Sequence, residues 1–396
     1  MIQPDSLRPA CGVRLHSLQS DAILFDRGTQ RMYHLNSSAS CIWRHIERNA
    51  DPNLAARGIA DSLGIDDATA LAYIRDMVEQ WAKLKLLDDG RRRRRDRSAR
   101  RKPIVAMSGS GLSVRAAITR RRHYALLGTI ASVGFTDNRL EEAVHPTLRH
   151  LETSDSSSSE LTVDVVALPK QYEIQRDGRR LGACASLSGV APLVNAHLFH
   201  LAIERYPHAL ALHSGAVMSA QGCLLLPAAS GSGKSTLTAA LVRAGWHYMT
   251  DDIVLLQRDS LNAVGVPNAL GLKAGAWQVL ASRYAELRTL PIHDRADGKR
   301  IRYVVPLNSR QSESIESAAV RWIVFPRYST DAPSEMSPLS TVNGLCRLMA
   351  HCCGLPERLT HEQVGGIIGW ISDVACFEMV FSDIEAAIRQ IDAHTH

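Results

Sequence analysis

The chain has 396 residues, enough for two or three domains, and its 45% hydrophobic and 22% charged residues are ordinary for a folded, water-soluble protein. The formal net charge of +6 is a mild basic excess, and the eight cysteines contain no Cys-x-x-Cys pair, which favours a reducing compartment over a disulfide framework. The first residues lack the pattern of a secretory signal and no apolar run of 18 residues exists, so we expect a cytoplasmic protein with no membrane partner.

The first ninety residues combine short strand patterns with helical patterns. Two apolar runs, 22–25 and 32–35, flank a turn at Asp26-Arg27-Gly28 and predict a β-hairpin. Asn36 then has the side chain expected of a helix N-cap. Helices are expected at 36–46, 51–63 and 66–87. We therefore predict a small α+β, winged-helix-like domain over residues 1–90.

This domain resembles the PqqD family of peptide chaperones. The similarity lies in the strand end Tyr33-His34-Leu35-Asn36, in the helix that carries Trp43, and in the late apolar pair Leu86-Leu87. The resemblance implies that an extended leader peptide pairs with the strand at 31–35 and packs beside the helix at 73–81. A DNA-binding winged helix is the alternative.

Residues 91–102, RRRRRDRSARRK, separate this domain from the rest of the chain. A run of like charges predicts a solvated linker, and its alternatives are non-specific contact with nucleic acid or attraction of an acidic peptide. No aromatic residue interrupts the run, which disfavours stacking on single strands, so we do not expect nucleic acid as the partner.

Residues 103–205 are expected to form an N-terminal extension of a catalytic core at 206–396. Within the extension, 113–130 is expected to be a helix with a basic face, and 161–168 alternates like a strand. The stretch 172–179 predicts a strand that runs into an Asp-Gly turn, and 190–206 predicts a helix.

The catalytic core is organised around a glycine-rich loop between a strand pattern and a helix pattern. An apolar run at 223–226 precedes the loop, and the helix that follows stops at Gly245. This order is typical of a phosphate-binding P-loop, although the first position of G-x-x-x-x-G-K-[ST] is Ala228. A Gly/Ser-rich turn that binds nothing is the alternative. The expected phosphate-binding residues are Ser230, Gly231, Ser232, Gly233, Lys234, Ser235 and Thr236.

Two aspartates, Asp251 and Asp252, stand just before an apolar strand pattern at 253–256. An acidic residue near a P-loop holds Mg²⁺, and a second one can accept the proton of an attacking hydroxyl. Lys234 would reach the β- and γ-phosphates of ATP, and the Ser235 hydroxyl would ligate Mg²⁺. A pair of ordinary turn aspartates is the alternative.

This core resembles the catalytic domain of the HPr kinase/phosphorylase family. The shared features are the P-loop, Gly245 seven residues before the second aspartate, the aspartate pair itself, and His213 in an upstream His-x-Gly stretch. The resemblance implies an α/β P-loop kinase fold that uses ATP and Mg²⁺. It also implies that His213 and Asp251 act together as acid and base and that Asp252 assists Mg²⁺.

Two basic residues beyond the aspartates lie in stretches that also look like HPr kinase-related proteins. Lys273 follows Leu270-Gly271-Leu272, and Arg327 lies in Phe-Pro-Arg-Tyr. Both are candidate phosphate or substrate contacts, with ordinary surface charge as the alternative. The arginine-rich stretch of true HPr kinases is not evident, so HPr itself is not the expected substrate.

Together these features predict an ATP-dependent kinase that phosphorylates a serine hydroxyl of a ribosomally made precursor peptide, of the lasso or a related type. Residues 1–90 would bind the leader, and tethering would raise the local concentration of the reacting end. The alternatives are a nucleotide-gated DNA-binding regulator and a kinase of a small metabolite such as free serine. HPr kinases are hexameric, so the resemblance allows a homo-oligomer that no pattern in this chain tests.

Overall fold

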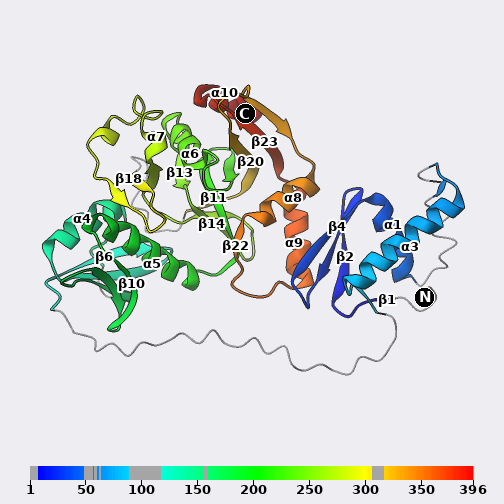
Figure 1. Ribbon diagram of the computed structural model, residues 1–396, viewed down its shortest axis with the longest axis horizontal. Helices are drawn as coiled ribbons and strands as arrows, with labels where there is room; N and C mark the ends of the chain where they lie inside the picture. The colour runs from blue at the N-terminus through cyan, green and yellow to red at the C-terminus, as the bar shows by residue number, and fades with distance from the viewer. Residues whose placement is uncertain are drawn as a thin grey trace. The chain divides into compact units, whose positions relative to one another are not determined.

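The computed structural model describes residues 8–48, 57, 60–61, 64–88, 117–155, 159–305 and 316–395. Contacts divide the chain into two compact units, the first made of residues 1–110 and 358–372 and the second of residues 111–357 and 373–396 (Figure 1). Each unit is described by itself. The expected basic linker at 91–102 lies outside the described residues. Among the residues described, no helix is long and apolar enough to cross a membrane.

The first unit contains the hairpin and the capped helix that the sequence predicts. A three-stranded antiparallel sheet has the order β2-β3-β4, and the side chain of Asn36 accepts a hydrogen bond from the backbone N–H of Ala39 at the start of α1. Most of the helix expected at 51–63 falls outside the described residues. The elements are β1 (Arg8–Pro9), β2 (Val13–Leu18), β3 (Asp21–Asp26), β4 (Arg31–Leu35), α1 (Ser37–Glu47), α3 (Asp67–Lys83) and β5 (Leu87–Asp88), which pairs with β1.

The core of this unit forms where α1 and α3 pack against the sheet. Trp43 of α1 is fully buried, and its ring meets that of Trp81 of α3 edge-on, with centroids 5.1 Å apart. Leu24 and Leu35 of the sheet pack in the same cluster. The apolar positions that the helical pattern singled out therefore hold the two helices to the hairpin.

A segment from far along the chain completes the first unit. The helix α9 (His361–Ser372) packs on β2, and the guanidinium of Arg358, just before it, donates hydrogen bonds to the carbonyl oxygens of Arg27 and Gly28. Gln30 and Leu359 exchange two hydrogen bonds, with the Leu359 N–H 2.7 Å from Oε1 of Gln30. The sequence did not indicate that residues 358–372 pack with the first unit, because they fall inside the range 206–396 that it assigned to the catalytic core.

The second unit begins with a five-stranded sheet of order β10-β9-β8-β7-β6. The helix expected at 113–130 is wrong over its described part. Residues 120–135 form an antiparallel hairpin that turns at Leu127 and Gly128, both with positive φ. The consecutive arginines of β6 instead divide between its two faces, with Arg120 and Arg122 paired to Glu141 and Arg121 paired to Asp164. Strand pairing here overrides a weak helical pattern. The elements are β6 (Arg120–Leu126), β7 (Thr129–Phe135), α4 (Asn138–Leu148), β8 (Ser159–Ala167), β9 (Tyr172–Arg176), β10 (Arg179–Cys184) and α5 (Val190–Arg205), with short helical turns at Arg149–Leu151 and Leu187–Gly189.

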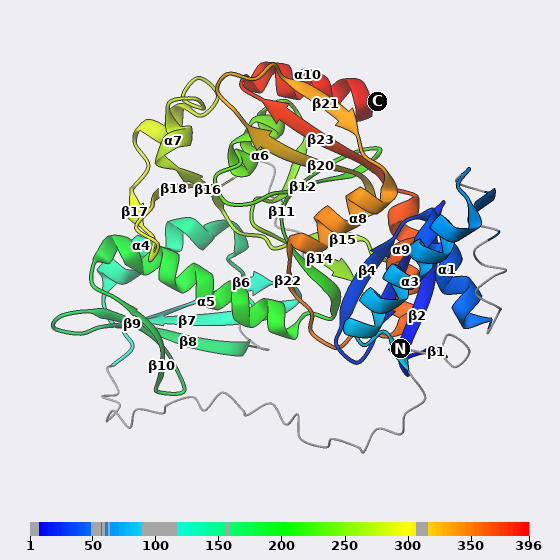
Figure 2. The same cartoon turned by 45° about the vertical axis from the view of Figure 1, so that its right-hand side comes forward.

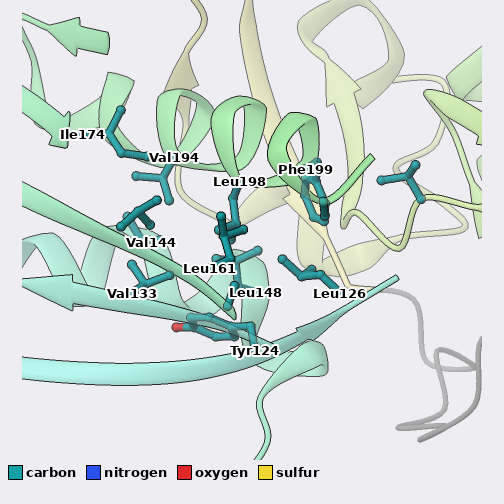
Figure 3. Close-up of a cluster of buried hydrophobic side chains, with 14 of the residues drawn as sticks. Tyr124, Leu126, Val133, Val144, Leu148, Leu161, Ile174, Val194, Leu198 and Phe199 are labelled. Atoms are coloured by element: carbon teal, nitrogen blue, oxygen red, sulfur yellow. The ribbon is translucent and has the colours of Figure 1, made fainter. Parts of the chain in front are cut away.

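Helices α4 and α5 cover one face of this sheet. Figure 3 shows Val194 and Leu198 of α5 directed toward Leu161 and Tyr124 of the strands. All four residues are fully buried. The strands at 161–168 and 172–179 and the helix at 190–206 are thus found close to where the sequence predicts them.

A larger sheet carries the glycine-rich loop. Its order is β19-β15-β14-β11-β12-β20-β23-β21, with β13 and β22 also paired to β11, and only β12-β20 and β20-β23 are parallel among its described pairs. Its strands are β11 (His208–Ser219), β12 (Gly222–Pro227), β13 (His247–Thr250), β14 (Ile253–Gln257), β15 (Ala263–Gly265), β19 (Ser317–Ala318), β20 (Val320–Tyr328), β21 (Glu335–Pro338), β22 (Cys352–Gly354) and β23 (Ala375–Phe381).

Helices α6 and α10 pack against this sheet through a cluster that includes Leu237, Leu241, Ile388 and Ile391. A three-stranded sheet of order β16-β18-β17 lies in the same unit (Figure 1). The remaining elements are α6 (Lys234–Arg243), β16 (Leu270–Lys273), α7 (Ala274–Trp277), a helical turn at Ala285–Arg288, β17 (His293–Asp294), β18 (Arg300–Val304), α8 (Thr341–Ala350) and α10 (Ile384–Thr395).

Candidate functional site

The glycine-rich loop connects the end of β12 to the start of α6. Gly231 and Gly233 have φ of 97° and 88°, a conformation that costs other residues about 1–2 kcal/mol. At Gly233 a Cβ would also lie 2.8 Å from the ring of Phe381. Ala228, where the strict P-loop pattern has glycine, is not among the residues with positive φ, so alanine carries no such strain there.

Polar groups at the start of α6 are left available for a ligand. No side chain caps this helix, so its first N–H groups point into the loop, where the helix dipole favours an anion. The Ser232 hydroxyl is buried and has no hydrogen-bond partner among the described residues. The Ser232 carbonyl accepts the Tyr328 N–H at 3.0 Å, which fixes the loop against β20. These features fit a phosphate group.

Asp251 is buried beside the loop, with 4% of its surface exposed. Its carboxylate accepts hydrogen bonds from Asn268 Nδ2 at 2.7 Å, from the Tyr248 hydroxyl at 3.2 Å and from the Gly271 N–H at 3.3 Å. The Ser235 side chain also hydrogen-bonds to it. Burial, followed by the charge of Asp252, raises the pKa of Asp251 above its ordinary value. These hydrogen bonds hold the Asp251 carboxylate in a fixed position beside Ser235 of the loop.

Asp252 has a different environment, because 56% of its side chain is exposed and it faces His213. Its Oδ1 lies 3.1 Å from Nδ1 of His213, and Nε2 of the same ring lies 3.2 Å from Nζ of Lys234. A neutral ring with its proton on Nδ1 satisfies both contacts. Desolvation opposes ionisation of Asp252, but the hydrogen bond from His213 and the charge of Lys234 outweigh it and lower the pKa.

Lys234 is the buried centre of this group, with 6% of its surface exposed. Burial lowers the pKa of its ammonium despite the opposing charges of Asp252 and Asp251. An anion placed against Lys234 would favour its charged form, because an opposite charge in a poorly solvated site interacts strongly. Lys234 is therefore placed to bind a phosphate, and a bound phosphate would raise the pKa of its ammonium.

Strand pairing brings these distant residues together. In the antiparallel pair of β11 and β14, His213 lies opposite Ile253, and the Ser214 N–H bonds the Asp252 carbonyl at 3.0 Å. On the other side of β11, the His213 N–H bonds the His351 carbonyl at 2.8 Å. The register of β11 therefore determines that His213, rather than another residue of this strand, meets Asp252.

The two basic residues singled out downstream have different positions. Lys273 lines the cavity at the loop, and its Nζ donates to the Ser230 hydroxyl at 2.9 Å. Arg327 is exposed and is not among the residues that line this cavity. Its neighbour Tyr328 does line the cavity, and successive strand residues face opposite sides.

Three further basic residues at the cavity were missed by the sequence reasoning, namely Arg283, Arg295 and Lys299. Arg295 and Lys299 lie between β17 and β18, and Nζ of Lys299 is 3.5 Å from the Ser230 hydroxyl. Asp297 pairs with both of them. The sequence does show basic residues on both sides of an Asp-Gly turn. Only the pairing of β16 with β18, however, brings that turn beside the glycine-rich loop.

One cavity of about 1860 Å³ within the second unit is bordered by His213, Gly231, Gly233, Lys234, Ser235, Asp251, Asp252, Lys273, Arg295 and Lys299. Ser232 and Arg327 are not among the residues that line it. In the part of the chain that the structure describes, no three His, Cys, Asp or Glu side chains are grouped as a metal site. Mg²⁺ needs no such cage, since it is commonly held by one or two carboxylates together with substrate phosphates and water. Ser235, Asp251 and Asp252 fit that mode.

Comparison with known proteins identifies one part of the chain. Residues 21–87 match the family described as Coenzyme PQQ synthesis protein D (PqqD), so the PqqD-like domain expected from the sequence is confirmed in that region. One similar solved structure is "TbiB1 in Complex with the TbiA(beta) Leader Peptide", at 21% identity and a TM-score of 0.20, covering 20% of this chain and 94% of that chain. No curated protein matches.

Proposed function

We propose that this protein is an ATP-dependent kinase that phosphorylates a serine hydroxyl of a ribosomally made precursor peptide. The second unit would carry the reaction, and the first would bind the leader of the peptide. The observation that carries the proposal is the convergence of Lys234, His213 and Asp252 in one cavity beside a loop suited to phosphate.

The proposed leader site is the β4 edge of the three-stranded sheet. Among the described strands, β4 pairs with β3 alone, so its outer edge offers unpaired N–H and C=O groups. Such an edge can accept an extended peptide as a further strand. The match to the coenzyme PQQ synthesis protein D family at residues 21–87 contains β4. The lasso type of substrate rests on the sequence resemblance alone.

The reaction assigns different tasks to the two aspartates. Bound ATP and Mg²⁺ would supply the phosphoryl group and neutralise part of the charge that develops on it. Asp252, exposed to the cavity and paired with His213, accepts the proton of the serine hydroxyl as its oxygen attacks phosphorus and ADP leaves. Asp251, buried beside Ser235, would help to bind the metal ion. This distribution differs from the one that the resemblance implies, in which Asp251 is the base.

The basic residues around the loop would bind the nucleotide. Lys234 holds the β- and γ-phosphates, and Lys273 and Lys299 stand over Ser230 at the other side of the loop. Burial and the neighbouring charges of Lys299 and Arg295 lower the pKa of Lys273. A polyphosphate would relieve that repulsion.

Intact-mass analysis tests the proposal. The full chain is incubated with ATP, Mg²⁺ and a precursor peptide encoded in its gene neighbourhood. The same peptide without its leader, and the leaderless peptide with the leader added separately, are run alongside. We expect the full peptide to gain one phosphate and the leaderless peptide to react more slowly. Bound ATP without a mass gain on any such peptide would contradict the peptide kinase and favour a metabolite kinase or a nucleotide switch.

A further inference from the structure

The cavity of the second unit is larger than a nucleotide requires. Pockets that enclose small molecules measure about 300–1,000 Å³, whereas this one has about 1860 Å³. Besides the glycine-rich loop, the lining includes residues along α5 and His213 in the middle of β11. Figure 2 shows α5 lying across the five-stranded sheet, on the side of the larger sheet.

One face of α5 borders this room along most of the helix. Pro192, Ala196 and His200 are spaced four residues apart, so they share one side, and all three line the cavity. The opposite side, with Val194 and Leu198, is buried against the sheet (Figure 3). At 1.5 Å per residue, the lining positions from Pro192 to Glu204 span about 18 Å, the length of roughly five extended residues.

The facing wall leads directly to the proposed catalytic pair. Cys353, Leu355 and Pro356 line the cavity just after the His351 carbonyl that bonds the His213 N–H. Leu355 is 38% exposed and offers an apolar contact on this wall. A chain lying between this wall and α5 would reach the pair formed by His213 and Asp252.

Charge divides the cavity into two parts. The five lysine and arginine side chains on its lining are Lys234, Lys273, Arg283, Arg295 and Lys299, and none of them belongs to α5 or to the facing wall. The same side of the cavity also carries carboxylates, those of Asp251, Asp252, Asp294, Asp297, Asp383 and Glu385. The α5 side instead carries two histidines and a single carboxylate, Glu204, which is 3.2 Å from His200. Lys273 and Lys299 gather at Ser230 of the glycine-rich loop, where a polyphosphate would bind, whereas the α5 side offers no lysine or arginine to an acidic ligand.

We propose that this face of α5, together with residues 353–356, binds the acceptor segment of the peptide in extended form and sets its sequence preference. The inference rests on the proposed kinase function and gives residues 183–205 a role in choosing the substrate. A segment of about five residues matches the length of the face. Neutral or basic residues beside the phosphorylated serine match its charge, whereas acidic ones do not.

The test uses charge changes at Ala196, which is exposed on the cavity face of α5 and belongs to no catalytic contact. Leaderless peptides with one serine flanked by either lysines or glutamates are phosphorylated by the full-length wild type, Ala196→Arg and Ala196→Glu. Ala393→Arg, at an exposed alanine of α10 outside the cavity, is the matched control. Nucleotide affinity and melting temperature are measured for every variant.

We expect the wild type to prefer the lysine-flanked peptide. Ala196→Arg should raise KM for that peptide at least tenfold, and Ala196→Glu should raise KM for the glutamate-flanked peptide, with nucleotide affinity unchanged. Ala393→Arg should behave as wild type. If the wild type transfers phosphate while both Ala196 variants keep its KM values, the proposal that α5 binds the acceptor segment is wrong and the proposed kinase function is retained. If the wild type transfers no phosphate either to these peptides or to the precursor peptide with its leader, the kinase proposal fails, and the groove fails with it.

Discussion

Replacing Asp252 with asparagine separates the two possible assignments of the catalytic base. The change keeps the size of the side chain and removes the carboxylate that lies 3.1 Å from His213. Removal of a general base lowers the rate of proton transfer by about 10²–10⁴-fold. At about 1.36 kcal/mol per tenfold, this equals about 3–5 kcal/mol of transition-state stabilisation.

The same structure predicts that the fold tolerates this change. More than half of the Asp252 side chain is exposed, with 56% accessible, and exposed contacts of this kind contribute only about 0–1 kcal/mol to stability. Asp252→Asn should therefore lose phosphotransfer without a comparable loss in the free energy of unfolding. Asp251→Asn makes the same chemical change beside Ser235 and should instead weaken Mg²⁺-dependent binding of ATP.

The assay measures single-turnover transfer of phosphate to the precursor peptide at saturating ATP, with the affinity for ATP measured separately at several Mg²⁺ concentrations. A loss of rate in Asp252→Asn with normal nucleotide affinity would support the assignment made from the geometry. If Asp252→Asn keeps the wild-type rate while Asp251→Asn loses it with ATP still bound, the assignment is refuted. The base would then be Asp251, as the resemblance to HPr kinases implies.

Three further predictions follow from individual contacts. Gly233→Ala should weaken ATP binding, because it adds about 1–2 kcal/mol of backbone strain and places a Cβ 2.8 Å from the Phe381 ring. Gly231→Ala carries the same kind of strain, but its Cβ meets nothing within 4 Å, so it should bind ATP more tightly than Gly233→Ala by isothermal titration, and equal affinities would contradict the steric argument. His213→Gln should raise the pKa of Asp252, because it removes a hydrogen bond that lowers that pKa, so the acid limb of the pH–rate profile should move to higher pH; an unmoved limb would show that Asp252 is not the titrating base. Trp43→Ala should lower the free energy of unfolding of the first unit by about 3–5 kcal/mol, since its side chain is fully buried against Trp81; hydrogen exchange in β3 should accelerate accordingly, with Trp43→Phe as the milder control.

Local patterns were sufficient for the elements whose causes are local. The hairpin at Asp26-Arg27-Gly28, the cap at Asn36 and the loop with its helix ending near Gly245 depend on short-range hydrogen bonds and on glycine conformation. Such features are readable because neighbouring residues satisfy them. The expected helix over residues 120–130 failed because pairing with β7 and β8 is not visible in a short window.

The sequence by itself determined which chemical groups this protein has: a glycine-rich loop with Lys234, two adjacent aspartates, and a domain over residues 21–87 that matches the PqqD family. It could not determine which aspartate meets His213, because that depends on the register between β11 and β14. Nor could it show that residues 358–372 pack with the N-terminal unit or that α5 borders the same cavity as the loop. These relations arise from contacts between residues far apart in the chain, whose burial and pairing are decided only when the whole structure forms.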